Sequence, residues 1–330
     1  MMPTKFLYLL VSGPEDVYLE QAYISASSCA RHNPDASLTL LTDKLTAEGW
    51  LRESPLSGPF RALFKEIKVV DLDASLPAMQ RSRLLKTGMR EYVEGDFLFV
   101  DADTVVARSL ADIDAFDAPL AACPDLHATF REHPHRRATV NMCKRLGFDA
   151  TLTRNYFNSG VMLVRDTPEN HAFFKAWQQN YLHGFAAGIK PDQPSLAQTD
   201  AQCAFPIREL PGEWNCQVQN GVRYLRDAYI LHYMVTNQSS GQEDKLYVLN
   251  SKDLLLRVRK EGLAPVEDIL GNPLRGYAPS VRVFAGEDLH FFQTRRYKWM
   301  RSKFSQEGFS LLEWLLKVKD HLLKRVYRCL

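Results

Sequence analysis

Short apolar runs alternate along this chain with stretches of helical length, and this order limits the fold more than any other feature. Such runs, ended by polar or turn residues, are typical of buried parallel strands. Strands that alternate with helices predict a doubly wound α/β sheet. The expected strands are Phe6–Val11, Leu38–Leu41, Ile67–Val70 and Phe97–Val100, with later strands of the same body at Gly160–Val164 and Tyr229–Leu231, and helices are expected over Tyr18–His32 and Ser82–Val93.

Composition places the chain among ordinary globular proteins. It has 330 residues, 45% of them hydrophobic and 24% charged, which excludes disorder and a disulfide-stapled miniprotein. The six cysteines are scattered without a C-x-x-C pair, so we expect a reducing, cytoplasmic compartment. Phe6–Val11 is too short for a signal peptide, and no apolar run of about 18 residues predicts a transmembrane helix.

Two aspartates directly follow one of the expected strands. Asp101 and Asp103 come after Phe97–Val100, and side chains two residues apart in an extended chain point the same way. Ligands of doubly wound sheets bind beyond the carboxyl ends of strands, so the pair suits a divalent cation. Two solvated turn aspartates are the plain alternative. A haloacid-dehalogenase phosphatase would need its threonine one residue later than Thr104.

Two further polar clusters accompany this pair. Asn158-Ser159-Gly160 precedes the expected strand Val161–Val164, where a glycine lets backbone and amide groups approach a ligand. Asp192-Gln193 lies between two prolines, which restrict the loop. Taken alone, the first cluster is as well explained by a turn, and an aspartate at a helix start is more often a cap.

Three single residues complete the pattern. His232 follows the run Tyr229–Leu231, and a histidine beside two carboxylates makes an O,O,N ligand set that suits Mn²⁺. Arg83 and Lys86 lie three apart, so on a helix they would share a face that could meet phosphate or sugar hydroxyls. A structural histidine and a solvated basic face are the common explanations of each by itself.

Together and in this order, the motifs resemble glycosyltransferase family 8, the glycogenin and lipopolysaccharide galactosyltransferase type, over about residues 5 to 235. The resemblance implies the Rossmann-like GT-A fold and transfer of a sugar, with retention of configuration, from a nucleotide diphosphate sugar, UDP being the expected nucleotide. It implies Mn²⁺ as the cofactor, with Mg²⁺ as the alternative, and Asp101, Asp103 and His232 as its ligands.

The resemblance also assigns roles to the other residues. Asp192, Gln193 and Asn158 would face the reacting sugar, and Arg83 would clamp Asp101 or the sugar. The family follows its metal histidine closely with a lysine that grips phosphate, whereas here Met234–Asp244 intervene and Lys245 is the substitute. The remaining donor-binding residues would be Val11, Ser12, Gly13, Asp16, Tyr18, Lys86, Ala102, Ser159 and Gly160.

Two other functions stay open at this point. A sugar-nucleotide nucleotidyltransferase would carry a Gly-rich basic loop after its first strand, whereas Val11–Asp16 is acidic and has one glycine. A non-catalytic nucleotide or sugar binder on the same fold is the second alternative, and the complete set of Asp101, Asp103 and His232 argues against it.

Charge is unevenly distributed along the chain. From Arg295 to Leu330 there are ten Lys and Arg against three Asp and Glu, which leaves 31 against 36 in the rest. A mildly acidic body argues against a nucleic-acid binder. We predict a GT-A catalytic domain over residues 1–290 and a basic amphipathic helix over 291–330. The helix would bind an anionic membrane surface, which fits a lipid-linked or other glycan acceptor, or else pack on the enzyme or in a homo-oligomer.

The acceptor itself is assigned to a region rather than to residues. The segment Asp125–Arg154 is rich in His, Arg and Pro and has no clean period, so we expect an irregular excursion beside the site that selects the acceptor.

Overall fold

A computed structural model describes residues 4–234, 246–278, 294–295 and 297. The chain divides into two compact units, residues 1–281 and 282–330. The predicted basic helix over 291–330 lies almost wholly outside the described residues, as does Lys245, so both remain predictions, with the boundary at 290. Within the described part, no helix combines the length and apolar character needed to cross a bilayer.

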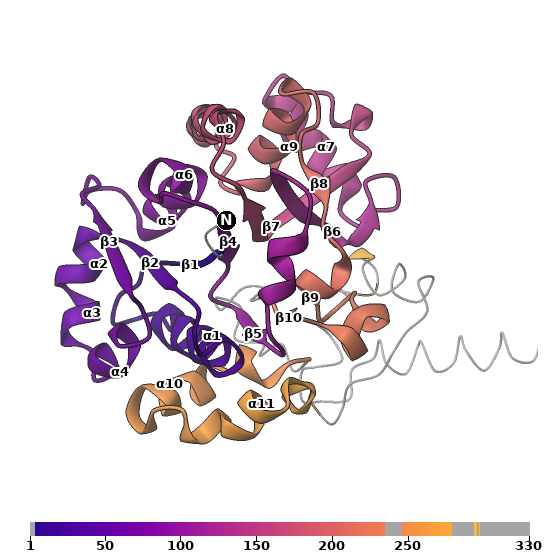
Figure 1. Cartoon of the computed structure of the whole chain (residues 1–330). Helices are drawn as coiled ribbons and strands as arrows, with labels where there is room; N and C mark the ends of the chain where they lie inside the picture. The colour runs from indigo at the N-terminus through magenta and orange to yellow at the C-terminus, as the bar shows by residue number, and fades with distance from the viewer. Residues whose placement is uncertain (1–3, 235–245, 279–293, 296, 298–330) are drawn as a thin grey trace, which may run out of the picture. The chain divides into compact units, whose positions relative to one another are not determined.

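A seven-stranded mixed sheet forms the centre of the first unit (Figure 1), in the order β3-β2-β1-β4-β7-β6-β8. The four strands β1 to β4 are parallel, whereas β7 is antiparallel to both β4 and β6, and β8 runs parallel to β6. The expected doubly wound sheet is therefore confirmed with an antiparallel β7. The strands are β1 Lys5–Leu10, β2 Leu38–Asp43, β3 Glu66–Val70, β4 Phe97–Val100, β6 Leu120–Thr129, β7 Asn155–Val164 and β8 Arg208–Glu209.

A second sheet of three short strands contains the last of the expected strands. It has the order β5-β10-β9, formed by Thr104–Val106, Ile230–His232 and Cys216–Gln217. The strand expected over Tyr229–Leu231 is present as β10, one residue later, and it belongs to this second sheet rather than to the main one. Strand β10 pairs antiparallel with β5, which begins directly after Asp103 and lies outside the main sheet.

The core lies on both faces of the main sheet. Alternate residues of β1 belong to different apolar clusters, Tyr8 and Leu10 to one and Leu7 to the other, because successive side chains of a strand point to opposite faces. Helices α1, α10 and α11 pack into the first cluster, and α5, α6 and α8 into the second (Figure 1). The helices are α1 Tyr18–His32, α2 Lys44–Glu48, α3 Trp50–Glu53, α4 Ser57–Arg61, α5 Ala78–Thr87, α6 Met89–Tyr92, α7 Arg136–Arg145, α8 Pro168–Ala186, α9 Gln193–Gln202, α10 Lys252–Glu261 and α11 Glu267–Gly271.

Two local expectations are corrected. The helix expected over Ser82–Val93 breaks at Gly88, where an added Cβ would lie 3.1 Å from the Leu84 carbonyl oxygen and closer still to Gln178. The segment Asp125–Arg154 is less irregular than expected, since it contains the end of β6 and the whole of α7. That helix buries only Thr139 and Cys143, which are too few to give a readable apolar period.

Helix α10 packs against the start of the chain. Arg259 on α10 pairs with Glu20 of α1 at 2.5 Å, and the Glu20 side chain is fully buried. The same guanidinium donates to the carbonyl oxygen of Pro14 at 2.7 Å and to that of Asp16, and it lies over the Trp50 ring. A residue far along the sequence therefore holds the turn that follows β1.

Candidate functional site

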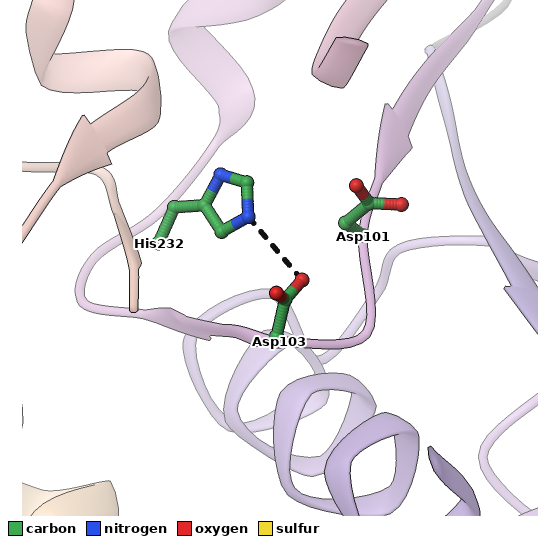
Figure 2. A group of neighbouring side chains, drawn as sticks. All are labelled: Asp101, Asp103 and His232. Atoms are coloured by element: carbon green, nitrogen blue, oxygen red, sulfur yellow. Dashed lines mark ion pairs between the residues drawn. The ribbon is translucent and has the colours of Figure 1, made fainter. Parts of the chain in front are cut away.

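The three predicted metal ligands come together at the carboxyl end of β4. Asp101 follows β4 directly, and its backbone N–H donates to the Gly160 carbonyl oxygen at 2.7 Å. His232 is the last residue of β10 and lies opposite Thr104 of β5, which places its ring beside Asp103. Figure 2 shows the three side chains converging, and their ligand atoms all lie within 4.8 Å of one another.

The donor set of this group fits a divalent cation. Two carboxylates and one imidazole form the mixed oxygen and nitrogen shell that Mn²⁺ accepts. His232 Nε2 lies 3.2 Å from Asp103 Oδ1, while Nδ1 contacts Asn215 Oδ1 at 2.9 Å. A ligating histidine in proteins usually has such a partner on its second ring nitrogen.

Electrostatics at the group favour an added positive charge. Burial raises the pKa of Asp101, Lys86 opposes the rise, and the nearby Asp103 carboxylate adds to it. Burial alone would lower the pKa of His232, but Asp103 outweighs it, so this pKa lies above its ordinary value. The buried ammonium of Lys86 lies 2.9 and 3.1 Å from the two Asp101 oxygens. A bound cation would relieve the repulsion between the two carboxylates that raises the pKa of Asp101.

Asp192 forms a second ionic group beside the first. Arg83 Nε lies 3.1 Å from Asp192 Oδ1, and Ser159 Oγ donates to Asp192 Oδ2 at 2.8 Å. Burial would raise the pKa of Asp192, but Arg83 and then Lys86 outweigh it and hold it below its usual value. Of the two contacts predicted for Arg83, the clamp on Asp101 is not formed, because Lys86 pairs with Asp101 and Arg83 with Asp192. The contact of Arg83 with the sugar stays a prediction. Asp192 also makes no helix-cap bond with its side chain, although α9 begins at the next residue.

The cluster Asn158–Gly160 lies within β7 and not in a turn before it, which corrects that expectation. Its polar side chains are tolerated in a buried strand because each has a partner. Asn158 Nδ2 donates to Asp125 at 2.8 Å, and the Gly160 N–H donates to Asn158 Oδ1 at 2.9 Å. A Cβ on Gly160 would lie 2.9 Å from both Asn158 Oδ1 and His232 Nδ1. Only glycine leaves room for the histidine at this position.

The residues after β1 form a compact turn, here called the donor loop (residues 11–18). Asp16 accepts hydrogen bonds from Ser12 Oγ at 2.6 Å, from the Gly13 N–H at 2.9 Å and from the Tyr18 N–H at 3.1 Å. Val11 is buried, whereas Tyr18 is exposed. Since β1 and β4 are neighbours and parallel, the donor loop and Asp101 lie at the same edge of the sheet.

Two predicted residues have modest contacts. Gln193 donates to the Phe157 carbonyl oxygen at 3.2 Å, and Ala102 is partly buried against the core.

Sequence reasoning missed the residues in the irregular middle of β6. Asp125 accepts from Asn158 and pairs with the buried His133 at 2.9 Å. The next two residues, Leu126 and His127, have φ of 54° and 52°, a conformation that costs roughly 1–3 kcal/mol for each such residue. Gln217 holds this turn, because its side chain accepts from the Leu126 N–H at 2.6 Å. Asp125 follows the apolar run Leu120–Cys123, so the rule that selected Asp101 could have found it.

Comparisons with known proteins address the fold. No protein-family model matches the chain, and a search of curated proteins finds no match either. Among solved structures, the apo bifunctional glycosyltransferase WbbM aligns with a TM-score of 0.50 at 15% identity, covering 71% of this chain and 46% of its own. The galactosyltransferase LgtC, in complex with donor and acceptor sugar analogues, aligns with a TM-score of 0.50 at 16% identity, covering 86% of this chain and 98% of its own. The fold is GT-A.

This likeness confirms the fold expected from the motifs. The chain spans about half the length of WbbM and nearly all of LgtC. At such low identity, any function must be argued from the side chains at the carboxyl edge of the sheet.

Proposed function

We propose that this chain is a metal-dependent glycosyltransferase that moves a sugar from a nucleotide diphosphate sugar, with UDP as the nucleotide, to a glycan or glycolipid acceptor. One observation carries the proposal. Asp101, Asp103 and His232 meet within 4.8 Å on a GT-A sheet, beside the ionic pairs Lys86–Asp101 and Arg83–Asp192.

The metal would be held by Asp101, Asp103 and His232, with Mn²⁺ favoured over Mg²⁺ by the imidazole. When bound, such an ion neutralises the negative charge that a diphosphate leaving group develops, worth several kcal/mol in the transition state. The chain supplies the rest. The donor loop would hold the base and ribose, and Lys86 adds a buried positive charge close to Asp101.

Asp192 would orient the donor sugar rather than attack it. Both of its carboxylate oxygens are engaged, one by Arg83 and one by Ser159, so neither is free to act as a nucleophile without breaking a contact. Retaining glycosidases form a covalent intermediate with such a carboxylate. We therefore favour transfer on the same face of the sugar, with a donor phosphate oxygen accepting the proton of the acceptor. Trapping of a glycosyl-enzyme in wild type but not in Asp192→Asn would contradict this.

The acceptor would approach from the side of Asp125–Arg154. If it is lipid-linked, the basic segment after Arg295 would bring the enzyme to an anionic membrane surface. Liposome flotation of the intact chain and of a chain ending before Arg295 tests this, and equal flotation of both would exclude an anchoring role.

Thermal stabilisation by UDP, with and without Mn²⁺, tests the proposal directly. At about 100 times the dissociation constant, linkage predicts roughly 2.7 kcal/mol of stabilisation in wild type. We expect this stabilisation to require both Mn²⁺ and Asp103, so Asp103→Asn should lose it. If another nucleotide stabilises the chain and UDP does not, the donor assignment is wrong. If no nucleotide does, the glycosyltransferase proposal fails.

A further inference from the structure

Asn215 lies directly behind the predicted metal ligand His232. Its Oδ1 is 2.9 Å from His232 Nδ1, and its Nδ2 donates to Asn158 Oδ1 at 2.9 Å. The Asn215 side chain has no exposed surface and sits at the end of a short 3-10 helix, residues Gly212–Asn215. No sequence motif includes it.

The orientation of these two amides is fixed from the far end of the network. Asn158 Nδ2 donates to Asp125 Oδ1 at 2.8 Å, and a carboxylate can only accept. The Gly160 backbone N–H donates to Asn158 Oδ1 at 2.9 Å, and a backbone N–H can only donate. Asn158 Oδ1 is therefore the acceptor side of its amide, and Asn215 must present Nδ2 to it.

Asp125 also accepts a hydrogen bond from His133, whose orientation is fixed. Its Oδ2 lies 2.9 Å from His133 Nε2, while His133 Nδ1 accepts from the His135 N–H at 3.2 Å. The proton of the neutral His133 ring is therefore on Nε2 and points at Asp125. Every group from His133 to Asn215 has one permitted orientation.

The network has one consequence for His232. Because Asn215 Oδ1 can only accept, the proton of the neutral His232 ring must be on Nδ1, which leaves the Nε2 lone pair directed toward Asp103. We propose that Asn215 is a positioning residue that fixes His232 as an Nε2 metal ligand. This inference rests on the proposed metal-dependent function. Asn215 itself touches neither the metal nor the substrate.

Mn²⁺ affinity of the full chain, measured by the EPR signal of free Mn²⁺, tests the role. Asn215→Leu keeps the shape of the side chain and removes both polar atoms, so we expect the dissociation constant to rise 10- to 100-fold. Asn215→Asp keeps an acceptor for His232 Nδ1 but loses the donor to Asn158 Oδ1, so it should bind Mn²⁺ more tightly than Asn215→Leu and less tightly than wild type. An Asn215→Leu chain that folds and binds Mn²⁺ as tightly as wild type would overturn the proposal.

Asn170 provides a matched control. It is a buried amide that donates to the carbonyl oxygens of Pro119 at 2.6 Å and Arg165 at 2.9 Å. Asn170 is on α8 and contacts Arg165, directly after the last residue of β7, whereas Asn158 is near the start of that strand. Asn170→Leu should therefore lower the thermal stability but leave the Mn²⁺ affinity unchanged. If both leucine variants weaken Mn²⁺ binding equally, Asn215 acts only through general stability and the proposal is wrong.

A measurement on the unsubstituted chain covers the case in which Asn215→Leu does not fold. In metal-free protein at a pH where the ring is neutral, long-range ¹H–¹⁵N correlations report which nitrogen of His232 carries the proton. We expect Nδ1. A proton on Nε2, which the Asp103 carboxylate would favour by itself, overturns the inference. If wild type binds no Mn²⁺ at all, the proposed function fails, whereas the position of this proton is still decided separately.

Discussion

The donor loop and the predicted metal ligands Asp101, Asp103 and His232, here called the metal group, are built in opposite ways, although they share one edge of the sheet. In the donor loop, Asp16 receives its three hydrogen bonds from residues within four positions of itself. In the metal group, Asp103 and His232 are 129 positions apart and meet only because β10 pairs with β5 in the register His232–Thr104. Local contacts thus shape the donor loop, whereas the metal group depends on tertiary pairing and on the buried network behind His232.

The largest effect is expected from Asp103→Asn, which disrupts the metal group and leaves the donor loop intact. Asp103→Asn removes one charge from the ligand set, and we expect transfer or donor hydrolysis to fall about 1,000-fold, since a metal contributes several kcal/mol and each tenfold is about 1.4 kcal/mol. Release of UDP at saturating Mn²⁺ measures this. Asp253→Asn, at an exposed position on α10, is the control and should match wild type. Full Mn²⁺-dependent turnover by Asp103→Asn would exclude this residue as a ligand.

Gly160→Ala tests whether the metal group depends on packing behind the ligands. The new methyl group would press on His232 Nδ1 and Asn158 Oδ1, both held by hydrogen bonds, so we expect a loss of about 2 kcal/mol in the free energy of unfolding. Gly58→Ala is the matched control, because an added Cβ there meets nothing within 4 Å. Urea denaturation compares the two. Equal stability would show that the histidine can move without cost.

Asp16→Ala makes the converse test, because it disrupts the donor loop and leaves the metal group intact. It removes the acceptor of three local hydrogen bonds at a partly exposed position, so we expect UDP affinity to weaken by about 1 kcal/mol, or roughly fivefold. Because the three hydrogen bonds to Asp16 all come from within the donor loop, Mn²⁺ affinity without nucleotide should not change. Calorimetric titration of each ligand separates the two effects. A matching loss of Mn²⁺ affinity would mean that the two regions are not independent.

The smallest expected effect concerns the strained segment of β6 at Leu126 and His127. His127 Nε2 accepts from the Gln217 N–H at 3.1 Å, and burial lowers the pKa of His127 to about 4. In the unfolded chain the pKa is about 6.5, so between pH 6.5 and 4 the unfolded state binds more protons. Stability is therefore complete above pH 6.5 and falls as the pH drops toward 4. Because the side chain is partly exposed, we expect a loss on the order of 1 kcal/mol.

Denaturation at pH 7.5 and pH 5 measures this loss. His127→Gln keeps an acceptor without a titrating group and should show a shallower dependence on pH. His183→Gln, at an exposed position on α8, should keep the wild-type slope. If His127→Gln and wild type have the same slope, His127 does not contribute to the acid sensitivity.

The sequence predicted those parts of the site that follow apolar strands. β1, β2, β3 and β4 lie within two residues of the expected runs, and α1 has the expected bounds. Asp101 and Asp103 were predictable because a strand with both faces buried is apolar throughout. Polar residues that directly follow such a strand therefore stand out in the sequence.

The rest of the site depends on contacts that sequence periodicity does not encode. The separate sheet of β5, β9 and β10 has strands of only two or three residues, too short to show alternation. Asn215 follows a tryptophan in a 3-10 turn without any motif. Of the two partners predicted for Arg83, Asp101 was wrong, because helical spacing places Arg83 and Lys86 on one face but does not say which aspartate each one reaches.

The contact of Arg259 with Glu20 has a consequence for synthesis on the ribosome. The two residues are 239 positions apart, so β1, the donor loop and the strand pair β5 and β10 emerge before α10 exists. Until then the Glu20 carboxylate has no arginine partner and keeps that surface of α1 hydrated, because burying an unpaired charge is costly. The donor loop is thus translated early, whereas the arginine that contacts it is translated only with α10.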